Sequence, residues 1–266
     1  MSEKAHLRST DVRDIYHTEY FLERVDGYDE FASFDGSPKS LFSRARRNFE
    51  LLSVRPGERL LDLGCGRGEI AIAAGVAGAV AVGCDFSQGA IRLARGKARE
   101  IEARLGRSIH TSFICAIATE GTFAPNSFDH IYMAEFVEHV APQELAVILR
   151  SAHRWLRQGG RIFIYTHPNR WARRTYPLMR AYTRAATGVD TGAIPPDMTH
   201  PDYKKLHLNE QSYLSLRRAL GRAGFRDVRV RFDRPDTPGR CAPLKRLFLY
   251  QVLFGYDIVG QGTKRA

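Results

Sequence analysis

Three glycines at alternate positions follow a short apolar run near residue 60. They come directly after residues 60–63 and are Gly64, Gly66 and Gly68. Glycine permits positive φ angles and close approach of a ligand to the backbone, and a helix that begins after such a turn offers free amide donors. This arrangement suits the carboxylate of a ligand with an amino-acid part.

Two acidic residues mark the ends of neighbouring apolar runs. Asp62 lies just before the glycines, and Asp85 ends the next run. At the tip of a neighbouring strand, the Asp85 carboxylate can accept both hydroxyls of a ribose, whereas Ser87 is better placed to cap the following helix. We therefore predict that Asp85 binds ribose. Dinucleotide-binding proteins use a related turn, but with the spacing Gly-x-Gly-x-x-Gly.

Further polar residues follow two later apolar runs. After residues 128–132 come Glu135, Glu138 and His139, and after residues 161–165 comes His167. Histidine suits proton removal near neutral pH because its unperturbed pKa is about 6.5. We interpret His139, Glu138 and His167 as candidate catalytic residues. A purely structural role for the Glu138–His139 pair stays open.

Alternating strands and helices must position these residues. The predicted strands are 59–63, 79–84, 112–116, 128–132 and 161–165, with an edge hairpin of 225–232 and 257–261. The predicted helices are 40–53, 68–76, 88–105, 142–157 and 210–223. This alternation predicts an α/β fold with a doubly wound, mostly parallel, seven-stranded sheet, whose ligands bind at the carboxyl ends of the strands.

Two segments carry a resemblance to a known family. LLDLGCGRGEIAI, from residue 60, and VGCDFSQGAIRLAR, from residue 82, resemble the cofactor half of class I S-adenosylmethionine-dependent methyltransferases. Residues 127–131 and 156–164 resemble the entries to that family's fourth and fifth strands. The resemblance covers 58–166 and implies a Rossmann-like methyltransferase fold that takes S-adenosyl-L-methionine and releases S-adenosyl-L-homocysteine.

The resemblance also implies roles for individual residues. Gly64, Cys65 and Gly66 would line the methionine portion of the cofactor, and Asp62 would hold the turn or reach the cofactor's amino group. Phe86 would pack on adenine. The family's acidic adenine contact falls on Ile117 here, so backbone groups of Ala118 and Thr119 would replace it. The full predicted cofactor set is Asp62, Gly64, Cys65, Gly66, Gly68, Asp85, Phe86, Ala118, Thr119 and Glu135.

The predicted reaction is O-methylation of a small-molecule, sugar or lipid-linked acceptor. The Glu135-x-x-Glu138-His139 stretch resembles that of ubiquinone-biosynthesis O-methyltransferases, where it is associated with a divalent metal; a metal is compatible here but is not predicted. The flanks resemble fatty-acid-modifying and glycan-modifying methyltransferases. The alternatives are C-methylation of an unsaturated lipid, RNA methylation, a nicotinamide-dependent oxidoreductase and a non-catalytic binding module. No Tyr-x-x-x-Lys pair supports the oxidoreductase.

Composition and length favour one domain. The chain has 266 residues, 44% of them hydrophobic, and a net charge of +11 that favours anionic partners. We divide it into an N-terminal helical cap (1–57), a cofactor-binding core (58–166), an acceptor lid (167–209) and a C-terminal part (210–266). The arginines near 44–47 and 92–107 are interpreted as solvated helix faces.

Three smaller expectations concern location and packing. Without a signal-peptide core or an apolar membrane span, we expect a cytoplasmic protein, with peripheral membrane contact suggested by the aromatic and basic residues near 171–184. The four cysteines are expected to be reduced and mostly buried. The pair Tyr16 and Tyr20 is expected in the core rather than at the cofactor. Oligomeric state is not readable.

Overall fold

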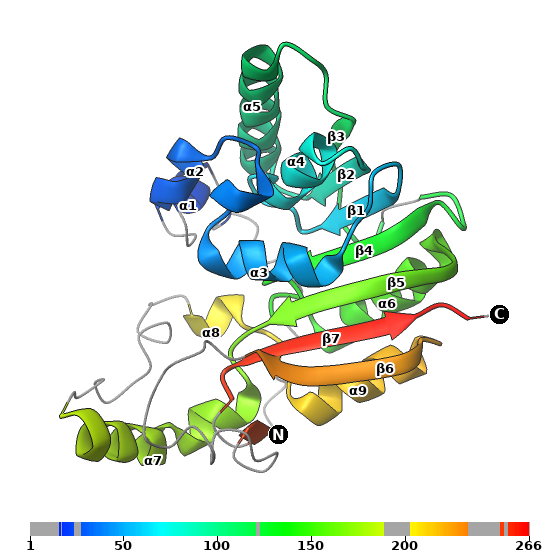
Figure 1. The fold of residues 1–266 in the computed structure, drawn as a ribbon. Coiled ribbons are helices and arrows are strands. Elements are labelled where there is room, and N and C mark those ends of the chain that lie inside the picture. Colours follow the sequence, from blue (N-terminus) through cyan, green and yellow to red (C-terminus); the bar gives the residue numbers. More distant parts are fainter. Residues whose placement is uncertain are drawn as a thin grey trace.

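The computed structural model describes residue 16 and residues 18–23, 28–120, 123–188, 203–233, 251–252 and 255–265. In this part of the chain a seven-stranded sheet forms the centre (Figure 1). Its strands are β1 (Arg59–Leu63), β2 (Val80–Asp85), β3 (Thr111–Cys115), β4 (Phe128–Ala134), β5 (Leu156–Thr166), β6 (Arg226–Asp233) and β7 (Asp257–Thr263).

The strand order is β3-β2-β1-β4-β5-β7-β6. Strands β1 to β5 pair in parallel, whereas β7 pairs antiparallel with both β5 and β6. The predicted fold class and the edge hairpin are therefore confirmed. The chain moves outward from β1 through β2 to β3 and then returns to place β4 on the other side of β1. A crevice at such a reversal is the usual ligand site of an open α/β sheet.

Helices cover both faces of the sheet. One core cluster lies under α3 (Ser43–Leu52), α4 (Glu69–Val76) and α5 (Gln88–Leu105), and the other lies under α6 (Pro142–Trp155) and α9 (Tyr213–Arg222). Because successive strand residues point to opposite faces, Leu60 enters the first cluster, while Leu61 and Leu63 enter the second. The two apolar sets along each strand hold the sheet between two helix layers.

The remaining helices lie beyond the carboxyl ends of the strands, some on the side of β1–β3 and the others on the side of β5–β7 (Figure 1). They are α1 (Thr18–Glu23), α2 (Tyr28–Ser33), the short 3-10 helix η2 (Pro38–Ser40), α7 (Arg170–Thr187) and α8 (Tyr203–Leu206). Of the predicted acceptor lid, α7 and α8 are described, and residues 189–202 lie outside the described ranges, as do His200 and Cys241. No described helix is long and apolar enough to cross a membrane.

Local sequence explains where α5 and α4 begin. The Ser87 hydroxyl accepts the amide of Ala90 at 3.2 Å, so Ser87 caps α5 as predicted. Helix α4 follows Gly68, whose φ is 82° and whose missing Cβ would lie 2.6 Å from Phe113. Only glycine fits this position, so the fold itself requires glycine at position 68, whether or not a ligand binds there.

The sheet differs from the prediction at β5. This strand begins at Leu156, whereas the sequence predicted a strand only from 161 and continued the preceding helix to 157. Leu156 pairs with Phe128, and the register shifts between Phe128 and His130, so the strand continues through an irregularity. Gly159 accommodates this irregularity with a φ of 77°.

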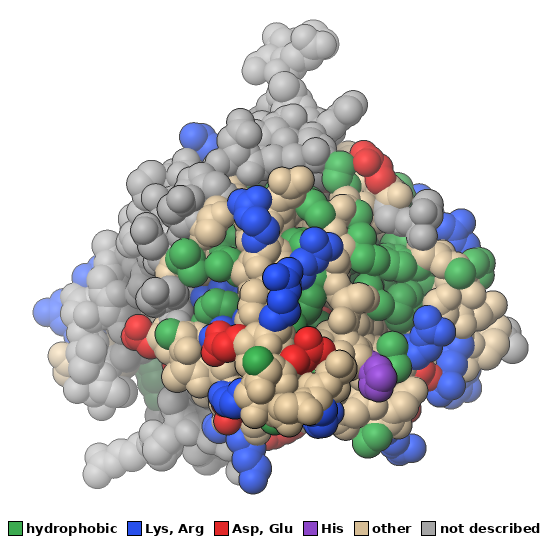
Figure 2. All heavy atoms as spheres, turned by 90° about the horizontal axis from the view of Figure 1, so that it is seen from above, with side chains coloured by type: hydrophobic (Ala, Val, Ile, Leu, Met, Phe, Trp, Pro, Cys, Tyr) green, Lys and Arg blue, Asp and Glu red, His purple; other side chains and the backbone are tan. Residues whose placement is uncertain are grey.

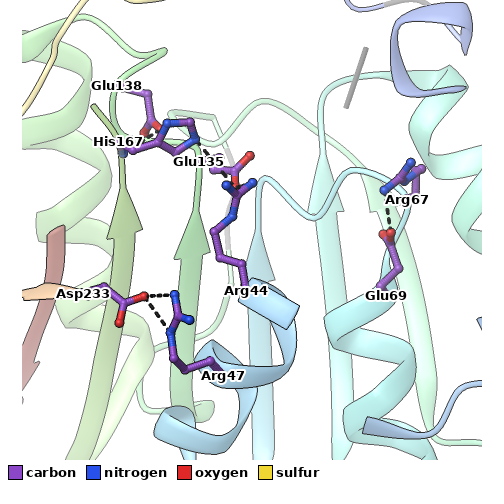
Figure 3. Close-up of polar contacts among 8 residues, drawn as sticks. All are labelled: Arg44, Arg47, Arg67, Glu69, Glu135, Glu138, His167 and Asp233. Atoms are coloured by element: carbon purple, nitrogen blue, oxygen red, sulfur yellow. Dashed lines mark hydrogen bonds and ion pairs between the residues drawn. The ribbon is translucent and has the colours of Figure 1, made fainter. Parts of the chain in front are cut away.

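The surface charge follows the prediction only in part. On the face in Figure 2, Lys and Arg side chains lie among hydrophobic and acidic ones rather than in one continuous patch. The arginines of α3 are not simply solvated, however. Arg47 donates its Nε–H to Asp233 of β6 at 2.9 Å, and Arg44 reaches the site described below (Figure 3). Of the predicted buried thiols, Cys65 and Cys84 are buried and Cys115 is exposed.

Candidate active site

A cavity of about 220 Å³ lies at the carboxyl ends of β1, β2 and β4. Its lining includes residues 62–67 after and at the end of β1, residues 84–86 at the end of β2, 116–119 after β3 and 134–136 after β4. These segments meet because parallel strands end at one edge of the sheet. The cavity therefore occupies the crevice where the strand order reverses.

The glycine turn forms one wall of the cavity. Gly64 and Gly66 have φ angles of 77° and 50°, and a Cβ on Gly64 would lie 2.5 Å from the ring of Phe136. The amides of Gly64 and Cys65 donate to the carbonyl of Cys84 at 2.8 and 3.1 Å, which fastens the turn to β2. Of the predicted turn residues, Gly68 alone does not line the cavity.

Asp85 lies in the lining with acceptor capacity left over. Its side chain is buried and accepts the amides of Gly66 at 3.0 Å and Ser87 at 2.9 Å, one on each oxygen. A carboxylate offers roughly four acceptor positions, more than these two amides use. Burial raises the pKa of Asp85 despite these bonds. This arrangement suits the ribose role predicted from the sequence.

The cavity is acidic. Burial, followed by the charges of Glu69 and Asp85, raises the pKa of Asp62 to about 8. The two lining arginines are each paired, Arg67 with Glu69 at 2.8 Å and Arg44 with Glu135 at 2.5 Å (Figure 3). Among the described residues, neither Asp62 nor Asp85 forms an ion pair, so this end of the cavity favours a cationic ligand.

Residues beyond β2 and β3 line the far side. Phe86, Ala118 and Thr119 lie there as the sequence predicted, together with Ile117. The ring of Phe86 meets that of Tyr16 edge-on, with centroids 5.3 Å apart. These residues offer an aromatic face and the backbone of residues 117–119 to a flat heterocycle.

The N-terminal aromatic residues differ from expectation. Tyr16, Tyr20 and Phe21 all line the cavity, although the sequence favoured a core role for the tyrosines. Ser87 donates its hydroxyl to the Tyr16 carbonyl at 2.8 Å, and Arg67 donates to the Phe21 carbonyl at 3.1 Å. These bonds hold the N-terminal segment over the glycine turn. The spacing of the tyrosines alone could not tell which surface they would meet.

The three polar residues after β4 do not share one position. Glu135 and His139 line the cavity, whereas Glu138 does not. The Glu138 side chain is 1% exposed and accepts the Thr166 hydroxyl at 2.9 Å and the His167 amide at 3.4 Å, so it fixes the end of β5. Within the described ranges, no group of three or more His, Cys, Asp or Glu is arranged to hold a metal ion.

His167 lies beside Glu135 rather than in the lining. Its Nε2 is 3.8 Å from Glu135 Oε1 (Figure 3). Burial opposes protonation of His167, but the adjacent Glu135 carboxylate and the charge of Glu138 outweigh it and raise the pKa of His167 to about 9. A histidine that is already protonated at neutral pH is a poor proton acceptor, which argues against the predicted catalytic role.

His139 is held in one tautomer. Its Nδ1 lies 3.0 Å from the carbonyl oxygen of Leu206 in α8. Because a carbonyl only accepts hydrogen bonds, Nδ1 must carry a proton, so in the neutral ring the lone pair lies on Nε2. The ring centroid is 4.9 Å from that of His207, whose pKa falls to about 3 because of burial and the charges of His139 and His167.

Sequence reasoning missed part of the lining. Arg44, Asn48 and Tyr132 also face the cavity. Arg44 and Asn48 are one helix turn apart, next to the buried Ala45 and Phe49 of α3. A polar pair spaced by four residues along the apolar side of a helix was the available signal.

Residues 61–164 match the family model of a methyltransferase domain. The wheat (Triticum aestivum) phosphoethanolamine N-methyltransferase is 32% identical over 117 residues, which are 43% of this chain and 21% of that protein. The ubiquinone biosynthesis O-methyltransferase of Idiomarina loihiensis is 36% identical over 110 residues, 41% of this chain and 42% of that protein. The chain thus spans less than half the length of these relatives.

Solved structures share the fold across most of the chain. Phosphoethanolamine N-methyltransferase 2 of Haemonchus contortus, in complex with S-adenosyl-L-methionine, gives a TM-score of 0.60 at 16% identity and covers 94% of this chain and 60% of that one. A SAM-dependent methyltransferase from Archaeoglobus fulgidus gives 0.53 at 21% identity, covering 90% of this chain and 100% of that one.

Proposed function

Since residues 61–164 form a methyltransferase domain of the class I, S-adenosylmethionine-dependent type, we propose that this chain methylates a hydroxyl oxygen of a small-molecule, sugar or lipid-linked acceptor. The observation that carries the choice of a hydroxyl is the fixed tautomer of His139 at the cavity.

The residues present fit the cofactor. The buried Asp85 carboxyl lies in the cavity lining, where it could accept from ribose hydroxyls, and the glycine turn leaves room where a Cβ would stand. The uncompensated carboxyls of Asp62 and Asp85 suit a ligand with a sulfonium and an ammonium group. The spacing Gly64-x-Gly66-x-Gly68, which differs from Gly-x-Gly-x-x-Gly, supports the methyltransferase over the oxidoreductase alternative.

His139 is the proposed general base. A hydroxyl beside its ring would donate its proton to Nε2 while the oxygen gains the methyl group, and Leu206 would hold the imidazole in place throughout. S-adenosylmethionine, when bound, supplies an electrophilic methyl carbon on a positive sulfur. Since the leaving group is a neutral thioether, the protein mainly aligns the acceptor and removes its proton. General-base action of this kind contributes about 10²- to 10⁴-fold.

A phosphorylated amine is a second candidate acceptor. Two of the similar proteins are named phosphoethanolamine N-methyltransferases. In this chain, the Arg44 guanidinium lies in the cavity lining beside Glu135 and could share its charge with an anionic acceptor group. The same Nε2 of His139 would accept the proton from an ammonium. An acceptor comparison is needed to separate the two candidates.

The first experiment tests the cofactor. Purified protein is titrated calorimetrically with S-adenosylhomocysteine and, in parallel, with NAD, and the titrations are repeated on Asp85→Ala. We expect binding of S-adenosylhomocysteine alone, weakened about tenfold or more by the substitution, because hydrogen bonds to a charged group contribute about 1.5–3 kcal/mol each. Tight binding of NAD instead would refute the proposal.

The second experiment tests the acceptor and the base. Release of S-adenosylhomocysteine is measured with phenols, sugars, lipid-linked glycans and phosphoethanolamine. With the best acceptor, we expect His139→Gln to lower kcat about 100-fold or more while leaving S-adenosylhomocysteine affinity unchanged. His110→Gln, at an exposed histidine, is the matched control. Turnover restricted to phosphoethanolamine would favour the second candidate acceptor. Full activity of His139→Gln would rule out His139 as the general base.

A further inference from the structure

Helix α7 exposes a row of large apolar side chains. The exposed fractions are 39% for Trp171, 65% for Leu178 and 39% for Tyr182. Seven residues make two helix turns and four make one, so these three side chains lie along one face. Trp171, Leu178 and Tyr182 are called the α7 row below.

Arginines accompany the α7 row. The helix sequence holds five arginines and no acidic residue. Arg170, Arg174 and Arg184 are exposed. The Arg174 guanidinium lies over the Trp171 ring, 5.3 Å from its centroid, so the positive charge and the apolar row are adjacent. An apolar stripe flanked by arginines is typical of helices that lie in a membrane interface.

The helix is anchored to the sheet near the cavity. It begins at Arg170, just beyond β5, and lies past the carboxyl end of that strand (Figure 1). Asn169 caps it by accepting the Trp171 amide at 3.2 Å. The same Asn169 donates to the carbonyls of Val252 and Gly255 at 3.1 and 2.8 Å, which ties the helix start to the segment before β7. None of the described residues of α7 lines the cavity.

We propose that α7 docks the protein on a membrane surface that contains anionic lipids. The arginines would lie among the negative headgroups, and the α7 row would enter the boundary between headgroups and acyl chains. Nucleic acid is the less suitable polyanion, because the most exposed member of the row is Leu178, which can neither stack on a base nor form a hydrogen bond. Lipid instead removes its apolar surface from water.

Docking through α7 would hold the carboxyl edge of the sheet near the membrane. The cavity lies at the same edge of the sheet, so docking would bring it closer to a lipid-linked acceptor. The binding proposal does not depend on the proposed transfer reaction, because vesicle binding is measured without cofactor or acceptor.

The test is sedimentation with vesicles of phosphatidylcholine alone and of phosphatidylcholine with phosphatidylglycerol. We expect binding to the anionic vesicles only, weakened by added salt. Leu178→Asp should reduce partitioning about tenfold or more, since burying a leucine is worth about 1.5–3 kcal/mol in transfer. Leu105→Asp is the matched control, because Leu105 is 39% exposed at the end of α5, which lies at the opposite end of the sheet from α7 (Figure 1). Circular dichroism of both variants confirms folding.

Tryptophan fluorescence gives a second readout. The chain has two tryptophans, Trp155, which is fully buried, and Trp171. A blue shift on adding anionic vesicles that is lost in Trp171→Phe would place the α7 row in the lipid. Three results would overturn the proposal: no binding to anionic vesicles, equal losses for Leu178→Asp and Leu105→Asp, or binding of single-stranded RNA without binding of vesicles.

Discussion

Glu135 and His167 form a charged pair at the end of two neighbouring strands, with 3.8 Å between Oε1 and Nε2. Burial would raise the pKa of Glu135, but the adjacent His167 and the charge of Arg44 lower it to about 2. The pKa of His167 rises to about 9 for the matching reason. The pair therefore links the residues after β4 to the end of β5 by a contact that depends on pH.

The first prediction is a loss of stability in alkali. A histidine with a raised pKa stabilises the fold fully below its unfolded value of 6.5 and loses that contribution as the pH rises through about 9. The contribution is about 3 kcal/mol. The melting temperature of the wild type should therefore fall by about 5–10 °C as the pH rises from about 6.5 to about 9.

His167→Gln should remove most of this alkaline fall, whereas His110→Gln should keep it. Glu135 acts in the opposite direction, because its lowered pKa gives stability that is present above about 4.5 and lost as the pH falls toward 2. An alkaline fall of the same size in His167→Gln would assign the pH dependence to other groups.

The second prediction concerns the glycine turn. Gly64→Ala would place a Cβ 2.5 Å from the Phe136 ring at a φ of 77°, so we expect about 1–3 kcal/mol of destabilisation and loss of S-adenosylhomocysteine binding. Gly96→Ala is the control, because Gly96 is exposed in α5 and its Cβ would meet nothing within 4 Å. Gly96→Ala should raise the free energy of unfolding by about 0.5–1 kcal/mol. Denaturant melts and calorimetry decide both.

The third prediction concerns the N-terminal segment that lies over the glycine turn and includes Tyr16, Tyr20 and Phe21. Arg67 is buried, pairs with Glu69, donates to the Phe21 carbonyl and lies 4.7 Å from the Phe31 ring centroid. Arg67→Met would leave Glu69 buried without its partner, at a cost of about 3–5 kcal/mol. We expect faster hydrogen exchange in residues 18–23 and 28–33.

Arg265→Ala is the control for Arg67→Met. Arg265 pairs with Asp227 at an exposed site, and its removal should change stability by less than about 1 kcal/mol. If hydrogen exchange in residues 18–23 and 28–33 is unchanged in Arg67→Met, other contacts hold the N-terminal segment over the glycine turn.

The fourth prediction concerns cofactor affinity. The pKa of Asp62 is raised to about 8, so the free protein holds this carboxyl largely protonated at neutral pH. A cationic ligand favours the ionised form, and S-adenosylhomocysteine carries an ammonium group. We expect its affinity to rise with pH up to about 8, by at most about tenfold per pH unit. Asp62→Asn should flatten this profile in calorimetry, and an unchanged slope would contradict the assignment.

Much of the fold follows from local sequence. The strand before the glycines, the cap at Ser87 and helix 88–105 were predicted at their observed positions, because apolar periodicity and capping act over a few residues. The start of β5 was not predicted, because its first residues are held by pairing with β4 rather than by their own propensity. The same limit applies to the site, where Glu138 and Glu135 share a short segment but face different surroundings.

The sequence by itself determined the α/β fold, the glycine turn and the place of Asp85 at the end of β2. Only the tertiary structure decided that Tyr16 and Arg44 reach the cavity. It also decided that His167 pairs with Glu135 and that the Leu206 carbonyl fixes a proton on Nδ1 of His139. The first group depends on contacts between near neighbours and on strand order. The second depends on pairings between residues far apart in the chain, which residue type and spacing do not encode, because each exists only once the helices have packed on the sheet.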